Sequence, residues 1–276
     1  MWSAPLLYER LTWPEVRRAA SEDRVALIPV ATLEDHGPHL PIDCDLRIAS
    51  EICRRAAEAL PDETVLLPSI PHGYDPHHLD FPGALSIEWD TFTRYCRDVG
   101  LSLAHHGFTR MLYLNGHGSN QNLVEVAARL VNVAYSGVLA AAAFYLASPE
   151  GLRVVEDVRE STRGGMGHAC ELETSIYLAI DPDGVDMSKA VDERNPNETE
   201  HAWFDWTDGS LKVMPWWSSF SVTGVHGDAT KATAEKGMKL LDAAVDECVS
   251  YVRELRSMKL PARREPRETP KRKDPA

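Results

Sequence analysis

Four apolar segments of strand length, separated by segments with helical spacing, constrain the fold of this chain most strongly. The apolar runs occupy residues 25–30, 64–70, 110–115 and 137–147. Strands that alternate with helices form a mostly parallel sheet whose two faces are both covered by helices. The sequence therefore predicts an α/β fold, and specifically a three-layer α/β/α domain.

The segments between and after these runs are expected to be helical. Helices are predicted over residues 45–60, from Ser86 to about 106, and over 122–135, 168–180 and about 231–256. Asp45 and Asp228 are well placed as N-caps of the first and the last of these helices, and Ser86 could cap the second. We predict a single domain over residues 1–258. The remaining residues, 259–276, are charged and Pro-rich, a composition typical of a disordered tail.

Composition and charge limit the possible partners. The formal net charge of −13 disfavours binding to nucleic acid or to an anionic membrane surface. No apolar run approaches the roughly 18 residues that a membrane span needs. The five cysteines are odd in number, scattered and free of any CxxC pair, which indicates a reducing compartment. We therefore expect a cytoplasmic protein that acts on a small molecule, with no nucleic-acid or membrane partner.

Glu34, His36 and Asp45 form the first cluster of chemically active residues, directly after the first apolar run. Residues i and i+2 of an extended segment project to the same side, so Glu34 and His36 can reach one point. Carboxylate and imidazole ligands suit zinc, manganese or iron. Asp45 could add a third ligand from the start of the next helix. A polar surface loop without a metal would contain the same residue types.

His117 lies in a second cluster, which follows the third apolar run and opens a helix. Gly116 and Gly118 flank it, and glycines let the backbone turn tightly and approach a ligand closely. His117 would then project from the carboxyl edge of the sheet. A glycine-rich turn with a chance histidine is the alternative. Two clusters at two strand ends make coincidence less probable.

His168, Glu171 and Glu173 form a third cluster. If this segment is helical, His168 and Glu171 share one face, being three residues apart, and Glu173 points elsewhere. Glu173 could equally be a capping or structural carboxylate.

Three further residues could contact a substrate or could be structural. His226 lies in a glycine-flanked turn, and we favour a structural role for it slightly. Trp216 and Trp217 could line a substrate pocket, but paired aromatic residues are as common in cores and subunit interfaces.

Several sequence blocks, in this order, resemble those of the creatininase family. They are LEDHGPHLPIDCD (33–45), GYDPHHLDFPG (73–83), NGHGSN (115–120) and HACELETS (168–175). The resemblance extends over roughly residues 25–237, and several blocks in order are far more specific than any single motif. It implies an α/β/α fold, often as a homohexamer. It also implies metal ligation by residues matching Glu34, His36, Asp45 and His117, with Asp45 bridging where two metals are bound.

The sequence departs from that family at two positions. Ser119 stands where creatininase has a glutamate that binds the second metal, so that metal is either lost or held by Glu171. Asp75 stands where creatininase-like sequences have a serine that touches the substrate, which suggests a different polar group on the substrate, such as a hydroxyl or an amine. His78, in the same block, is a further candidate for substrate contact.

We therefore predict a metal-dependent hydrolase that cleaves a C–N bond in a small polar substrate other than creatinine, using one or two divalent ions (Zn, Mn or Fe). His168 is the predicted proton shuttle, because the ordinary pKa of imidazole is about 6.5. Glu171 would bind a second metal or orient the attacking water, and Glu173 would support the His168 region. The alternatives are a family hydrolase acting on a peptide, a formamide or an oxidised sugar or inositol ring, and a non-catalytic metal-binding protein.

Overall fold

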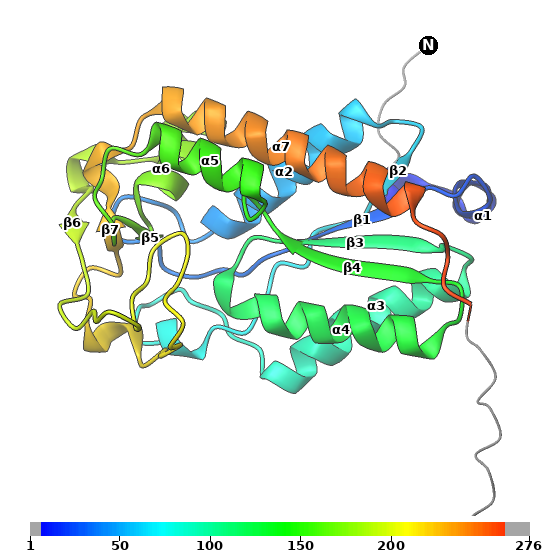
Figure 1. Cartoon of the computed structure of the whole chain (residues 1–276), viewed down its shortest axis with the longest axis horizontal. Coiled ribbons are helices and arrows are strands. Elements are labelled where there is room, and N and C mark those ends of the chain that lie inside the picture. Colours follow the sequence, from blue (N-terminus) through cyan, green and yellow to red (C-terminus); the bar gives the residue numbers. More distant parts are fainter. Residues whose placement is uncertain (1–6, 263–276) are drawn as a thin grey trace, which may run out of the picture.

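A four-stranded parallel sheet forms the centre of the computed structural model, which describes residues 7–262. The strands β1 (Val25–Val30), β2 (Thr64–Leu66), β3 (Arg110–Asn115) and β4 (Leu139–Phe144) have the order β2-β1-β3-β4. The predicted α/β fold with a mostly parallel sheet is confirmed (Figure 1). The second and fourth strands are shorter than the apolar runs that predicted them.

Helices cover both faces of this sheet. One core joins the sheet to α2 (Cys44–Ala59), α5 (Pro149–Val158), α6 (Glu171–Ile180) and α7 (Ala234–Ser257). The other joins it to α1 (Trp13–Ser21), α3 (Trp89–His105) and α4 (Gln121–Ala134). Along β1, Val25 and Leu27 pack into the first core, and Ala26 and Ile28 into the second. Successive side chains of a strand point to opposite faces, so a strand buried on both sides has to be apolar throughout.

A second, smaller sheet lies at one end of the molecule (Figure 1). Its strands β5 (Met166–His168), β7 (His226–Asp228) and β6 (Asp192–Glu193) are antiparallel, in the order β5-β7-β6. This sheet was not predicted from the sequence, because its strands are too short to show a hydrophobic period. It brings His168 and His226 onto adjacent strands.

Three of the predicted helix caps are wrong. Asp43, not Asp45, occupies the N-cap position of α2, and Asp45 lies in the first turn with its side chain buried. Helix α7 is capped by Thr233, while Asp228 caps a separate short turn. Helix α3 begins after Ser86, whose hydroxyl accepts a hydrogen bond from the backbone of a neighbouring loop instead.

The segment 168–180, predicted as one helix, is divided between two elements. His168 ends β5, and α6 begins at Glu171. Between them Ala169 has a φ of 51°, in the left-handed region that residues with a Cβ rarely adopt. His168 and Glu171 therefore do not share a helical face.

Helix α7 ends at Ser257, next to the predicted boundary of the tail. Of the predicted tail, residues 263–276 lie outside the described part of the chain. Among residues 7–262, no helix is both long and apolar enough to cross a membrane.

Candidate metal centre

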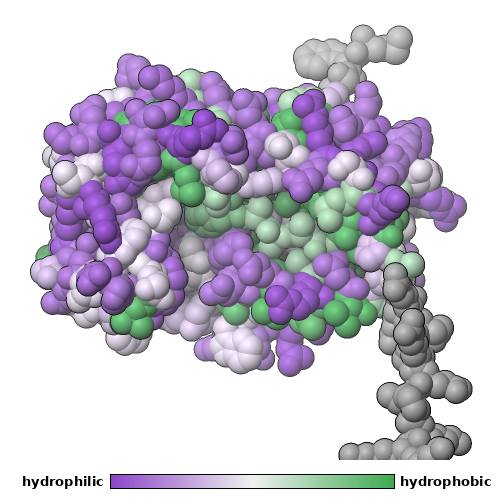
Figure 2. Space-filling view, viewed as in Figure 1, coloured by the Kyte–Doolittle hydropathy of each residue, from purple (hydrophilic) through white to green (hydrophobic). Residues whose placement is uncertain are grey.

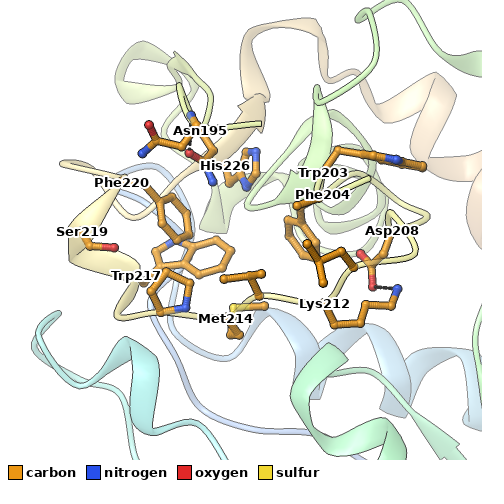
Figure 3. Close-up of a pocket in the computed structure, with 15 residues that line it drawn as sticks. Asn195, Trp203, Phe204, Asp208, Lys212, Met214, Trp217, Ser219, Phe220 and His226 are labelled. Carbon is orange, nitrogen blue, oxygen red and sulfur yellow. Dashed lines mark hydrogen bonds and ion pairs between the residues drawn. The ribbon is translucent and has the colours of Figure 1, made fainter. Parts of the chain in front are cut away.

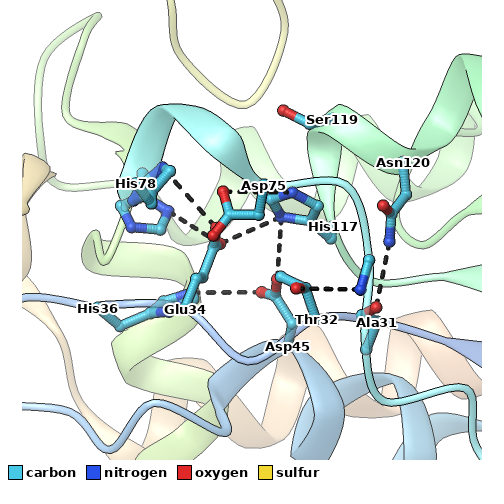
Figure 4. A network of polar contacts seen from close by, with 12 residues as sticks. Ala31, Thr32, Glu34, His36, Asp45, Asp75, His78, His117, Ser119 and Asn120 are labelled. Atoms are coloured by element: carbon cyan, nitrogen blue, oxygen red, sulfur yellow. Dashed lines mark hydrogen bonds and ion pairs between the residues drawn. The ribbon is translucent and has the colours of Figure 1, made fainter. Parts of the chain in front are cut away.

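The predicted metal ligands meet at the carboxyl ends of β1 and β3. Glu34 and His36 follow β1, His117 follows β3, and Asp45 projects from the first turn of α2. All four are buried (Figure 4). Open α/β sheets commonly place their sites at this edge, because loops from neighbouring parallel strands converge there.

Asp45 links two groups of potential ligands. Its Oδ2 lies 3.2 Å from His117 Nδ1, which is 3.1 Å from Glu34 Oε1. Its Oδ1 lies 3.3 Å from His36 Nε2, which is 4.0 Å from Glu173 Oε2. In each group, Glu34–Asp45–His117 and His36–Asp45–Glu173, the ligand atoms lie within 4.8 Å of one another. A carboxylate with one oxygen directed to each group has the arrangement of a bridging ligand.

Buried nitrogen and oxygen atoms without hydrogen-bond partners make this cluster suitable for a divalent cation. Within residues 7–262, both ring nitrogens of His36 and Oε2 of Glu34 are buried and make no hydrogen bond, although buried polar atoms are normally paired. Burial, together with the charge of Asp75, raises the pKa of Glu34 well above its ordinary value. Burial also raises the pKa of Asp75 to about 6. Buried carboxylates and imidazoles crowded together in this way are the donor set that divalent metals take in proteins.

A glycine permits this assembly. A Cβ added at Gly116 would lie 2.9 Å from the carbonyl oxygen of Asp45 and 3.0 Å from Cβ of Ala49. The loop after β3 can therefore lie against α2 only because residue 116 has no side chain. This contact brings His117 to Asp45. A Cβ at Gly118 would meet nothing within 4 Å.

His168 lies beside the cluster in a defined tautomer. Its Nε2 is 2.8 Å from the backbone carbonyl oxygen of Asp35. A carbonyl only accepts hydrogen bonds, so Nε2 carries the proton and Nδ1 has a free lone pair. That Nδ1 lies 3.7 Å from Glu34 Oε1. Burial lowers the pKa of His168 well below its ordinary value, which favours the neutral ring.

The structure does not bring Glu171 to the cluster. Its carboxylate accepts hydrogen bonds from the backbone amides of Glu160 and Ser161, at 2.9 and 2.8 Å, and from Lys236 Nζ at 2.7 Å. Among the described residues it belongs to no group of potential metal ligands. The prediction for Glu171 assumed that His168 was helical. With His168 in a strand, Glu173 is the carboxylate of α6 that faces His36.

Asp75 and His78, predicted to contact substrate, border the metal ligands. Asp75 is fully buried, neither of its carboxylate oxygens has a hydrogen-bond partner within residues 7–262, and Oδ1 lies 3.9 Å from His117 Nε2. His78 donates from Nδ1 to Asp35 Oδ1 at 2.6 Å and directs Nε2 toward Glu34 Oε2, 3.7 Å away.

The structure separates the two adjacent tryptophans. Trp217 is buried, and its ring stacks on that of His78 with the centroids 4.5 Å apart. Trp216 is 53% exposed. His226 is buried on the far side of Trp217, with the ring centroids 6.0 Å apart.

Two residues at the site were not among the predicted site residues. Asp35 holds His78 through its carboxylate and His168 through its backbone carbonyl. His77 lies 3.6 Å from Asp75 Oδ1 and 3.3 Å from the hydroxyl of Ser119. Both residues are adjacent to predicted ones. Asp35 belongs to the first predicted cluster but was given no role, because alternation in an extended segment directs its side chain away from those of Glu34 and His36.

The fold and these side chains together define an α/β/α protein with a metal centre of the kind that activates water for hydrolysis. The chain matches the profile of the Creatininase family (creatinine amidohydrolase) over residues 9–252. It belongs to the creatininase family and is a metal-dependent hydrolase.

The names of relatives in this family specify several different substrates. Creatinine amidohydrolase from Pseudomonas putida is 27% identical over 88% of this chain and 95% of its own length. Mycofactocin precursor peptide peptidase from Mycobacterium tuberculosis is 31% identical over 82% of this chain and 83% of its own. The 3-dehydro-scyllo-inosose hydrolase of Thermotoga maritima is 25% identical over 90% of this chain and 83% of its own.

Solved creatininase structures have the same fold. A crystal structure of creatinine amidohydrolase superposes with a TM-score of 0.77 at 26% identity, covering 92% of this chain and 99% of that one. Another, described as creatininase Mn, has a TM-score of 0.76 at 26% identity over 90% of this chain and 98% of that one. These matches associate the shared fold with divalent-metal chemistry.

Proposed function

We propose that this protein hydrolyses a C–N bond, of the amide or cyclic amide type, in a small polar substrate other than creatinine. The observation that carries the proposal is Asp45, a buried carboxylate shared between two buried groups of potential metal ligands. The departure at Ser119 and the buried Asp75 argue against creatinine itself. The named relatives, at 25–31% identity, act on a precursor peptide and on 3-dehydro-scyllo-inosose as well as on creatinine. The alternatives are a peptide, a formamide or an oxidised sugar or inositol ring.

The proposed centre holds two divalent ions, with zinc, manganese or iron as the candidates. Glu34, Asp45 and His117 would hold one, and His36, Asp45 and Glu173 the other. Glu173 then supplies the carboxylate that creatininase has at the position of Ser119. A bound ion of this kind lowers the pKa of a coordinated water and polarises a carbonyl oxygen.

His168 is the proposed proton acceptor and donor. Its Nε2 proton is held by the carbonyl of Asp35, so Nδ1 is the atom free to take a proton at the side of the cluster. The Asp35 carboxylate orients His78 in the same way, with Nε2 directed toward the site. The shared partner fixes both imidazoles relative to Glu34.

Asp75 and His78 are proposed to contact the substrate next to the ligands. In the described part of the chain neither oxygen of Asp75 has a hydrogen-bond partner, so an N–H or O–H group of the substrate would be paired there. A serine at this position would offer a single, uncharged accepting oxygen in place of the two oxygens of a carboxylate. Asp75 would therefore distinguish this substrate from creatinine.

Hydrolysis of a panel of lactams, formamides, short peptides and sugar-derived ring ketones by the metal-loaded protein tests the proposal. For the preferred compound, Asp75→Ser is expected to lower kcat/KM roughly 10- to 100-fold, the cost of losing a hydrogen bond to a charged group. Two tightly bound ions with no turnover on any compound would instead favour the non-catalytic metal-binding protein.

We propose further that the catalytic domain spans residues 1–258 and that copies of the chain associate. Within residues 7–262, strand β4 is an edge strand that pairs only with β3. Beside it lies a hollow lined by Ala141, Ala143, Phe144, Tyr251 and Met258, which we call the β4 surface (Figure 2). An exposed apolar strand edge is a ready template for pairing with a second strand edge. A hexamer is the assembly that the family resemblance implies.

A cytoplasmic location is proposed from the cysteines. All five are buried and unpaired in the structure, which suits a reducing compartment.

A further inference from the structure

A cavity of about 360 Å³ is lined in part by Trp217, whose ring stacks on that of His78. Its walls come largely from the segment between β6 and β7 (Figure 3). A cavity of about 150 Å³ is sufficient to hold benzene, so this one has room for an aromatic ring and a short linker. None of the proposed metal ligands lines it.

Aromatic and apolar side chains dominate the lining. The lining includes Trp203, Phe204, Met214, Trp217 and Phe220 (Figure 3). The rings of Phe204 and Phe220 lie 5.9 and 4.7 Å from that of Trp217, both edge to face. An aromatic guest could continue this packing, because rings favour edge-to-face and offset contacts at such distances.

The charged residues of the lining neutralise each other. Lys212 Nζ lies 2.7 Å from Asp208 Oδ2. The cavity therefore presents no unpaired charge for an ionic group, and its occupant should be uncharged.

His226 supplies one unused polar position. It is 1% exposed and lines the cavity, and neither ring nitrogen makes a hydrogen bond within residues 7–262. Glu198 Oε1 approaches Nε2 to 3.4 Å without hydrogen-bond geometry. A buried polar group usually has a partner, so a ligand with a hydrogen-bonding substituent would complete this site.

The cavity and the metal centre share Trp217 as a wall. The indole stacks on His78 and lies edge-on to His168 with the centroids 5.0 Å apart. Its N–H donates to the carbonyl of Gly224 at 2.7 Å, which fixes the ring. The Trp217 ring therefore contacts both His78 and His168 and also lines the cavity.

We propose that this cavity binds an uncharged aromatic ring carrying a hydrogen-bonding group, and that this ring is the end group of a substrate whose scissile bond lies at the metal centre. The binding of the ring is independent of the proposed function, whereas its identity as part of the substrate rests on that function. The substrate would then be extended, with a polar part at Asp75 and an aromatic part beyond Trp217.

Fluorine NMR of the full-length, metal-loaded protein labelled with 5-fluorotryptophan tests the binding. Trp217, Trp203 and Trp216 are assigned from the variants in which each is replaced by Phe. Titration with p-cresol is expected to shift the signals of Trp217 and Trp203 and to leave that of the exposed Trp216 unchanged. Toluene, which lacks the hydroxyl, is expected to bind roughly fivefold more weakly, and His226→Phe should remove this difference.

Two matched variants locate the binding. Ala202→Phe places a ring inside the cavity and should abolish the shifts, whereas Val222→Phe, at a position 89% exposed and outside the lining, should not. Absence of any shift up to the solubility limit would overturn the proposal, as would shifts that persist in Ala202→Phe. Binding of p-cresol requires no turnover. An inactive protein that still binds p-cresol in this way would therefore contradict the proposed hydrolase activity but not the proposed binding of an aromatic ring in the cavity.

Discussion

Asp45 has the central role among the site residues because its two oxygens face different histidines, His117 at 3.2 Å and His36 at 3.3 Å. Glu34 and Glu173 complete the two groups from opposite sides. This arrangement distinguishes the two glutamates of α6, since Glu173 faces His36 and Glu171 faces Lys236.

Replacement of each glutamate by glutamine tests that distinction. Glu173→Gln should lose about one of two bound ions, because an amide is a much poorer metal ligand than a carboxylate. Glu171→Gln should keep both ions and lower the free energy of unfolding by about 1–3 kcal/mol, since it weakens a buried, charged hydrogen-bond network. Elemental analysis and urea unfolding measure the two effects. Metal loss from Glu171→Gln alone would reverse the assignment.

His168→Ala tests the proton-transfer role. The variant should lower kcat by roughly 10²- to 10⁴-fold, the usual contribution of a general acid–base group, with metal content unchanged. Added imidazole should restore part of the rate, because it can occupy the space of the missing ring. Full turnover without imidazole would show that another group transfers the proton, and His78 would be the next candidate.

At the scale of elements, the site depends on how closely the loop after β3 approaches α2. Gly116 sets this distance, because its α-carbon faces the Asp45 carbonyl. A side chain there meets backbone, which cannot rotate away as a flexible side chain could.

Gly116→Ala is expected to weaken metal binding by roughly 10- to 100-fold, comparable to the loss of a residue that orients a metal ligand. Gly118→Ala is the matched control, since its Cβ would meet nothing within 4 Å. Metal titration by calorimetry compares the two variants. Equal affinities would mean that the loop moves aside without cost.

The elements differ in how well the sequence predicts them. Strands β1 and β3 have the predicted limits, because strands buried on both faces are continuous apolar runs. The strand β5 consists of three residues, Met166–His168, held by pairing with β7, which is distant in sequence. No local pattern encodes such a pairing. Because this pairing was not predicted, His168 was assigned to a helix. For the same reason Glu171, and not Glu173, was predicted as the possible ligand of a second metal.

The metal-ligand candidates were more predictable than the residues around the substrate. Glu34, His36, Asp45 and His117 occur where buried strands end, so both the local chemistry and the sheet topology indicate them. The aromatic cavity instead depends on the folding of the segment between β6 and β7, which has little regular structure. The sequence alone does not indicate which of Trp216 and Trp217 is buried.

At the scale of the whole molecule, the β4 surface predicts self-association. Ala143→Glu would place a charge in this apolar hollow and is expected to convert the wild-type oligomer to single chains. Val222→Glu, at an exposed position outside the β4 surface, should leave the mass unchanged. Light scattering coupled to size exclusion gives the masses. A wild-type protein that is already monomeric would contradict the proposal.

The central claim is a two-metal centre bridged by Asp45, and anomalous diffraction from a crystal of the metal-loaded protein tests it most directly. We expect two peaks, one on either side of Asp45: one beside Glu34 and His117 and the other beside His36 and Glu173. A single peak, a peak at Glu171 or no peak in this region would contradict it.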